Sequence, residues 1–153
     1  GDLNREEFLF RVRALFEDVG SEDDFLAIWA DIFEVNQPMV DFAVQLAGHL
    51  PVYLLSNIGC IHLEHIRRTY DFVEHFQGGV FSYQVGCAKP ESEIYLLAEK
   101  QLGLNAETTV FIDDLAENVA SARHLGWNAV QYEFQNHTDF LARMEQLGLT
   151  HSA

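Results

Sequence analysis

Four short apolar stretches, each separated from the next by a helical pattern, constrain the fold of this chain most strongly. They are PVYLLSN (51–57), VFSYQVG (80–86), TTVFIDD (108–114) and WNAVQY (127–132). Between them apolar residues recur at helical spacing, as in PESEIYLLAEKQLG (90–103), which opens with proline and closes with glycine. Strands that alternate with helices are typical of a parallel sheet with right-handed crossovers. We therefore predict an α/β fold with a Rossmann-like parallel sheet and flanking helices.

The first 35 residues have a different pattern, with helical spacing and no strand. NREEFLFRVRALFEDV (4–19) reads as one helix, with Asn4 and Glu7 as a capping pair and Gly20 as its end, and a second helix begins at Ser21. We predict that residues 1–35 form a small helical unit in front of an α/β core at residues 36–153.

Polar residues follow three of the predicted strands directly. Ser56 and Asn57 end the first, Lys89 comes shortly after the second, and Asp113 and Asp114 end the third. The carboxyl ends of parallel strands meet at one edge of a sheet, where ligands of such folds bind. A hydroxyl, an ammonium and two carboxylates are the groups needed to bind a phosphoryl group with Mg²⁺. The adjacent carboxylates support this interpretation, because like charges in contact repel unless a cation lies between them.

These motifs, Ser56-Asn57 after a strand, AKPESEIY (88–95) and FIDDLAENVASARHLG (111–126), resemble the haloacid dehalogenase superfamily of hydrolases. The resemblance is to the branch of sugar-phosphate phosphatases and of the phosphatase-like domain of epoxide hydrolases. It implies that Ser56 hydrogen-bonds the phosphoryl group, with Asn57 helping through its backbone or its side chain, and that Lys89 neutralises the nucleophile and the phosphate. It implies that Asp114 ligates Mg²⁺, while Asp113 ligates it, binds a coordinated water or orients Lys89. Asn118 stands where many relatives carry an acidic residue.

The resemblance also implies what the chain lacks. The family's nucleophile is an aspartate in an Asp-x-Asp pattern after a first, central strand, and the sequence has no such motif after a strand. Residues 1–35 would then be part of the family's helical cap, where specificity resides. The strands that end at Ser56 and at Asp114 would face each other across a gap. An N-terminal segment, a segment swapped from another copy or direct pairing of the two strands could close it.

The composition limits the partners. The sequence has 24 acidic and 9 basic residues, for a net charge of -15, which argues against nucleic acid as a partner. Two cysteines, Cys60 and Cys87, are too few for a disulfide framework. Apolar runs are too short to span a membrane and no signal peptide is visible, so we expect a cytoplasmic protein. Aromatic residues of the partial cap favour a homo-oligomer.

The sequence therefore predicts a hydrolase of this family, most simply a Mg²⁺-dependent phosphatase for a small phosphorylated metabolite, truncated with respect to its nucleophile. A metal-independent haloacid dehalogenase is a variant of that prediction. The alternative is a catalytically inactive domain of the same fold that binds a ligand or a partner. His62 and His65, three residues apart on one predicted helix, are read as surface residues because no third metal ligand is evident.

Overall fold

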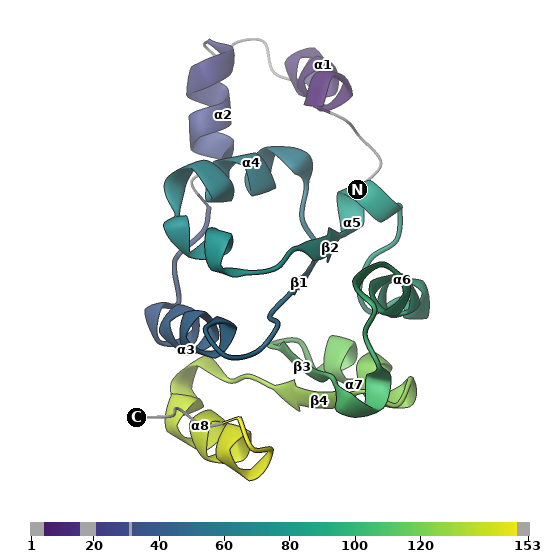
Figure 1. Cartoon of the computed structure of the whole chain (residues 1–153). Helices are drawn as coiled ribbons and strands as arrows, with labels where there is room; N and C mark the ends of the chain where they lie inside the picture. The colour runs from purple at the N-terminus through teal and green to yellow at the C-terminus, as the bar shows by residue number, and fades with distance from the viewer. Residues whose placement is uncertain (1–4, 16–20, 31, 150–153) are drawn as a thin grey trace.

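The computed structural model describes residues 5–15, 21–30 and 32–149 (Figure 1). Its strands are β1 (Leu54–Ser56), β2 (Gly79–Phe81), β3 (Val110–Asp113) and β4 (Asn128–Gln131). The α-helices are α1 (Arg5–Leu15), α2 (Glu22–Ala30), α3 (Gln37–Ala47), α4 (Cys60–Thr69), α5 (Ser82–Val85), α6 (Ser92–Leu102), α7 (Ala116–His124) and α8 (His137–Gln146). Three short 3-10 helices are η1 (Asp71–His75), η2 (Ala106–Thr108) and η3 (Phe134–Asn136).

The four strands are parallel, which confirms the predicted α/β class, but they form two separate pairs. β1 pairs with β2, with Ser56 opposite Phe81, and β3 pairs with β4, with Asp113 opposite Gln131. Within the described residues β1 and β3 are not hydrogen-bonded to each other. Direct pairing, one of the three ways to close the expected gap, is therefore not the arrangement that the chain adopts.

Helices cover both faces of the strand pairs, and one of them joins the pairs. On one face α6 and α7 pack against β2, β3 and β4 in a core built around Tyr95, Phe111 and Trp127. On the other face α3 and α8 pack against β3 and β4, where Phe42 and Phe140 meet edge to face with centroids 5.2 Å apart. Because α6 contacts residues of both strand pairs, the two halves share a hydrophobic core.

The two N-terminal helices lie away from the strands, with α2 beside α4 (Figure 1). An aromatic cluster of Phe8, Phe25 and Trp29 holds α1 and α2 together, and Trp29 stacks on His62 of α4. The predicted capping residue Asn4 and the predicted helix end at Gly20 lie outside the described residues. In the part of the chain that the structure describes, we find no helix with the length and apolar character that a membrane crossing requires.

Two predicted elements were wrong in their extent. The strand predicted at 80–86 ends at Phe81, and the chain continues as the short helix α5 up to Gly86, a left-handed residue with φ 73°. The chain leaves the strand at Ser82. The Ser82 hydroxyl accepts a hydrogen bond from the Ile58 N–H and donates one to the Ile58 C=O, which fixes the start of α5 against the loop after β1. The apolar spacing of IHLEHIRRTYDFVEHF (61–76) predicts one helix, but the helix breaks at Tyr70, whose backbone is extended, and the chain continues as η1.

Candidate active site

The residues predicted to carry the chemistry lie at the carboxyl ends of β1 and β3. Ser56 is the last residue of β1 and Asp113 the last of β3. Lys89 lies between α5 and α6, in the connection that leaves the β1–β2 pair. Side-chain bonds join Asn57, which follows Ser56, to Lys89, and Lys89 to Asp113, although 24 to 32 residues separate the bonded partners in sequence.

An ion pair between Lys89 and Asp113 is the centre of this group. Lys89 Nζ donates to Asp113 Oδ2 at 2.7 Å, and the two side chains are only 11% and 5% exposed. Lys89 Nζ also lies 5.6 Å from the centroid of the Phe111 ring, over which a cation is attracted. Since water screens this pair poorly, each charge depends on the other for compensation.

The second oxygen of Asp113 is fixed by the helix that follows it. Oδ1 accepts hydrogen bonds from the Leu115 backbone N–H at 2.9 Å and from Asn118 Nδ2 at 2.8 Å. Asn118 is 2% exposed, and its side chain points to Asp113 from the first turns of α7. Asp113 therefore orients Lys89, which is one of the three roles that the sequence left open for it.

Asn57 binds the backbone of the lysine. Its Oδ1 accepts from the Lys89 N–H at 2.8 Å and its Nδ2 donates to the Lys89 C=O at 2.7 Å. The end of β1 is thereby tied to the loop that carries Lys89. This reciprocal pair was not foreseen, because sequence spacing does not show what a side chain 32 residues away will bond.

Ser56 and Asp114 present free polar groups at the same edge. Ser56 is half-buried and its hydroxyl has no hydrogen bond within the described residues. Asp114 is exposed, and its C=O accepts from Gln131 Nε2 at 3.0 Å, while its carboxylate has no partner in the part of the chain that the structure describes. A free hydroxyl can donate to an anion and a free carboxylate can ligate a cation.

The site fits Mg²⁺ through one carboxylate. Asp114 is free to ligate, whereas both oxygens of Asp113 are already engaged by Lys89, Leu115 and Asn118. The described residues contain no group of three His, Cys, Asp or Glu side chains placed to hold a metal. Mg²⁺ usually takes one or two protein carboxylates together with waters and substrate phosphate oxygens, so Asp114 can serve as one ligand of such an ion.

The histidines, the buried cysteine and the tryptophan considered in the sequence are engaged in packing or in hydrogen bonds within the fold. His62 is stacked on Trp29, and His65 accepts or donates a hydrogen bond with Thr69. Cys87 is buried, and burial raises the pKa of its thiol above the ordinary value, so it stays protonated. Trp127 is buried in the core and donates its indole N–H to Glu99.

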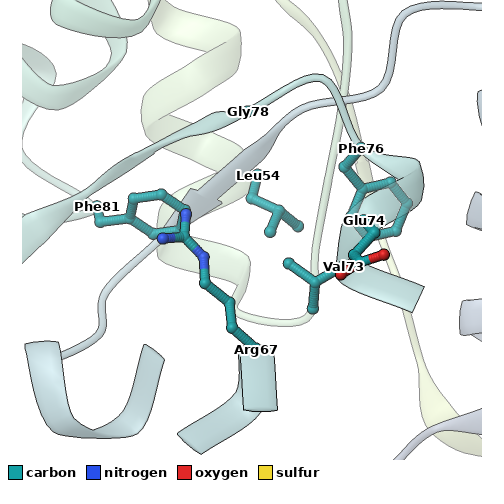
Figure 2. A pocket seen from close by; sticks show the side chains of 7 residues that line it. All are labelled: Leu54, Arg67, Val73, Glu74, Phe76, Gly78 and Phe81. Carbon is teal, nitrogen blue, oxygen red and sulfur yellow. The ribbon is translucent and has the colours of Figure 1, made fainter. Parts of the chain in front are cut away.

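A hollow of about 180 Å³ lies apart from this group (Figure 2). It is lined by Leu54 and Phe81 of the β1–β2 pair, by Arg67 of α4, and by Val73, Glu74, Phe76 and Gly78. Arg67 and Glu74 are exposed, and the Arg67 guanidinium packs over the Phe81 ring at 5.6 Å. None of the residues at the strand ends discussed above lines it, so the hollow and the candidate active site around the Lys89–Asp113 pair are separate.

A comparison with protein families identifies the family of this chain. The model of the haloacid dehalogenase-like hydrolases matches residues 5–126. The chain belongs to the haloacid dehalogenase-like hydrolase family. The resemblance inferred from the three motifs is confirmed, and the ion pair and its neighbours lie within the matched range.

Curated relatives of this haloacid dehalogenase-like chain include phosphatases. A sesquiterpene phosphatase of Aspergillus oryzae is 33% identical over 58% of this chain and 45% of its own length. A drimenol cyclase of Aspergillus calidoustus is 34% identical over 56% of this chain and 16% of its own length. A D-ribitol-5-phosphate phosphatase of Bacteroides thetaiotaomicron is 26% identical over 87% of this chain and 68% of its own length. The chain thus spans less than half of the first two relatives.

Solved structures of the family superpose well. A haloacid dehalogenase family enzyme of Bacteroides thetaiotaomicron matches with a TM-score of 0.80 and 26% identity, over 92% of this chain and 73% of that one. The same enzyme has been crystallised with magnesium and inorganic phosphate, in a form that matches with a TM-score of 0.77 and 28% identity, over 86% of this chain and 70% of that one. A predicted hydrolase of the family from Porphyromonas gingivalis, at 22% identity and a TM-score of 0.77 over 95% of this chain and 73% of that one, shows the fold alone.

Proposed function

We propose that this haloacid dehalogenase-like chain acts as a Mg²⁺-dependent phosphatase on a small phosphorylated molecule. The observation that carries the proposal is the nearly buried Lys89–Asp113 ion pair at the strand ends, with Asp114 next to Asp113 in the chain and Ser56 at the end of β1. The phosphatases among the relatives, and the solved structure with magnesium and phosphate, support this reaction class over dehalogenation.

Each residue has a role that follows from its chemistry. The Ser56 hydroxyl donates a hydrogen bond to a phosphoryl oxygen, and the Lys89 ammonium offsets the negative charge of the phosphoryl group. Asp113 holds Lys89, and Asp114 ligates Mg²⁺. The ion, when bound, supplies charge stabilisation to the transferring phosphoryl group.

The nucleophile is the part of the mechanism that the described residues do not provide. Asp113 is engaged by Lys89 and Asn118, and Asp114 is assigned to the metal. We propose that an aspartate at the end of a further parallel strand, lying between β1 and β3, attacks the phosphorus and displaces the alcohol of the substrate. Water then cleaves the aspartyl phosphate, which releases inorganic phosphate and restores the carboxylate. This strand could be supplied by a longer form of the polypeptide or by another copy.

The outer edges of β1 and β3 support such a strand. Val52 and Leu54 bond toward β2, and Thr109 and Asp113 bond toward β4. Because alternate residues of a strand turn their N–H and C=O groups to opposite edges, Leu55, Val110 and Ile112 turn theirs away from β2 and β4. All three are apolar and carry none of the charges or prolines that usually protect an edge strand.

Phosphate binding and turnover on the same sample test the function. We expect inorganic phosphate to bind the chain more tightly with Mg²⁺ than with EDTA in calorimetry, and Asp114→Asn to abolish the difference. Glu117→Gln, which removes a charge from an exposed residue on the next helix, is the matched control. Equal binding by wild type and Asp114→Asn would exclude the metal assignment.

Hydrolysis of p-nitrophenyl phosphate then separates an enzyme from a binding domain. Mg²⁺-dependent turnover that Lys89→Met removes supports the phosphatase, with the mass of the sample showing whether a further segment is present. Mg²⁺-dependent binding without turnover favours the alternative, an inactive domain that retains a ligand site. Metal-independent chloride release from 2-chloropropionate would instead identify a dehalogenase.

A further inference from the structure

The side chain of Asn57 pairs with Lys89 as the backbone of a neighbouring strand would. Oδ1 accepts from the Lys89 N–H and Nδ2 donates to the Lys89 C=O, at 2.8 and 2.7 Å. A primary amide that makes both bonds to one residue is fixed in its plane. Both polar atoms of the Asn57 side chain are therefore bonded to the lysine loop rather than free to contact a phosphoryl group.

A second side chain holds the same loop from the other strand pair. Ser121 of α7 donates its hydroxyl to the C=O of Pro90 at 2.6 Å. Asn57 follows β1, whereas α7 follows β3, and these two strands are not paired within the described residues. The loop at Lys89 and Pro90 is thus bonded to both halves of the core.

We infer that Asn57 and Ser121 are positioning residues that fix the Lys89 backbone so that its Nζ reaches Asp113. Neither contacts the phosphoryl group. The hydrogen bonds to the loop are observed in the structure, while the role of these bonds in catalysis rests on the proposed phosphatase function. In this arrangement a lysine held at both ends, by its backbone and by its ammonium, loses little entropy when phosphate arrives.

The sequence offers a direct probe, because Lys89 and Lys100 are its only lysines. Lys89 is 11% exposed and ion-paired, whereas Lys100 lies exposed in the last turn of α6. Trace labelling with acetic anhydride followed by peptide mass spectrometry gives the ratio of their acetylation rates. This ratio reports the freedom of Lys89 without requiring catalysis.

We expect Asn57→Ala to raise the acetylation of Lys89 relative to Lys100 several-fold, and Ser121→Ala to raise it less. Asn57→Asp keeps the acceptor for the Lys89 N–H and should give an intermediate ratio. Asn128→Ala is the matched control, since it also removes a side-chain bond to a backbone C=O, that of Glu107, near the start of β4. If Asn57→Ala does not fold, Asn57→Asp and Ser121→Ala carry the test.

An unchanged ratio in Asn57→Asp and Ser121→Ala would overturn the inference and leave the proposed function untouched. Where turnover is measurable, a positioning role predicts that Asn57→Asp lowers kcat more than it raises KM. A variant that loses phosphate binding while the labelling ratio stays constant would show instead that Asn57 contacts phosphate directly. Failure of Mg²⁺-dependent phosphate binding in wild type would overturn the function without affecting the labelling result.

Discussion

Asn118 donates from Nδ2 to Asp113 Oδ1 across 2.8 Å, in a part of the core where the Asn118 side chain is 2% exposed. Asp113 therefore receives Lys89 on one oxygen and Asn118 on the other. The Asn118 Oδ1 atom has no hydrogen-bond partner within the described residues, and the amide presents its Nδ2 to the carboxylate. Asn118, Asp113 and Lys89 are thus linked through their side chains, and Asn57 is linked to the backbone of Lys89.

Replacing Asn118 tests the first link of this chain. We expect Asn118→Ala to lower the free energy of unfolding by about 1.5 to 3 kcal/mol, the value of a hydrogen bond to a charged group. Asn118→Asp should cost more at neutral pH, because it puts a second carboxylate against Asp113. Burial beside a like charge raises the pKa of the introduced carboxyl, so that extra cost should shrink as the pH falls. Urea denaturation at two pH values measures both, and equal losses for the two variants at neutral pH would contradict the arrangement.

The Lys89–Asp113 pair should behave as a coupled unit. Lys89→Met leaves a nearly buried carboxylate without its cation, and Asp113→Asn leaves the reverse, each at a cost of about 3 to 5 kcal/mol. The double variant should lose less than the sum, by about 1 to 3 kcal/mol, because neither charge remains unpaired. A double-mutant cycle by chemical denaturation measures this coupling. Strict additivity would mean that the two charges do not depend on each other.

Tyr95 should make stability depend on alkaline pH. It is fully buried and donates to the Asn118 C=O at 2.9 Å, and burial, with a smaller effect of Asp113, raises its pKa to about 12. Because the folded pKa exceeds the unfolded value, the contribution is complete below the unfolded pKa and is lost as the pH rises through the folded pKa. Wild type should lose about 2 to 3 kcal/mol relative to Tyr95→Phe between about pH 10 and pH 12. Parallel stability curves for the two proteins would show that the hydroxyl ionises without constraint.

The sequence predicted the parts of the site that depend on local signals. Each strand that ends in Ser56 or Asp113 is a short apolar run that stops at polar residues, and this pattern places both at one edge of a parallel fold. The ending of β2 could not be predicted, since 80–86 reads as a strand by composition. What turns it into a helix is a bond between Ser82 and Ile58, 24 residues apart.

The roles of the site residues depend on where their side chains point, which the spacing of residues in the sequence does not show. Asp113 and Asp114 are equivalent in sequence, but the structure turns one to Lys89 and leaves the other exposed. The separation of the strands into two pairs likewise depends on which backbone edges meet. Such choices arise from contacts between distant segments, for which one sequence carries little local signal.

His62 should control how firmly the N-terminal helices are held. Its ring stacks on Trp29 at 6.0 Å and meets Phe33 edge to face at 5.2 Å, and its Nε2 lies 3.1 Å from the Trp29 C=O. Each ring contact contributes about 0.5 to 1.5 kcal/mol, so His62→Ala should accelerate hydrogen exchange in α2 several-fold. His75→Ala removes an exposed imidazole from η1 and serves as control. Equal exchange in α2 for both variants would exclude His62 as the anchor.

Gly79 should be required for the close approach of β2 to β1, and so for the position of Ser56. A Cβ at Gly79 would lie 2.4 Å from the Leu54 carbonyl oxygen and 2.9 Å from the Leu54 Cβ, distances that force the two strands apart. We expect Gly79→Ala to lower the free energy of unfolding by about 2 to 3 kcal/mol, as overpacking does, and to weaken phosphate binding. Gly59→Ala is the matched control, because its nearest neighbour would be His62 Nδ1 at an ordinary 3.9 Å. Denaturation midpoints that fall equally in the two variants would show that the close approach of Gly79 to Leu54 adds no cost of its own.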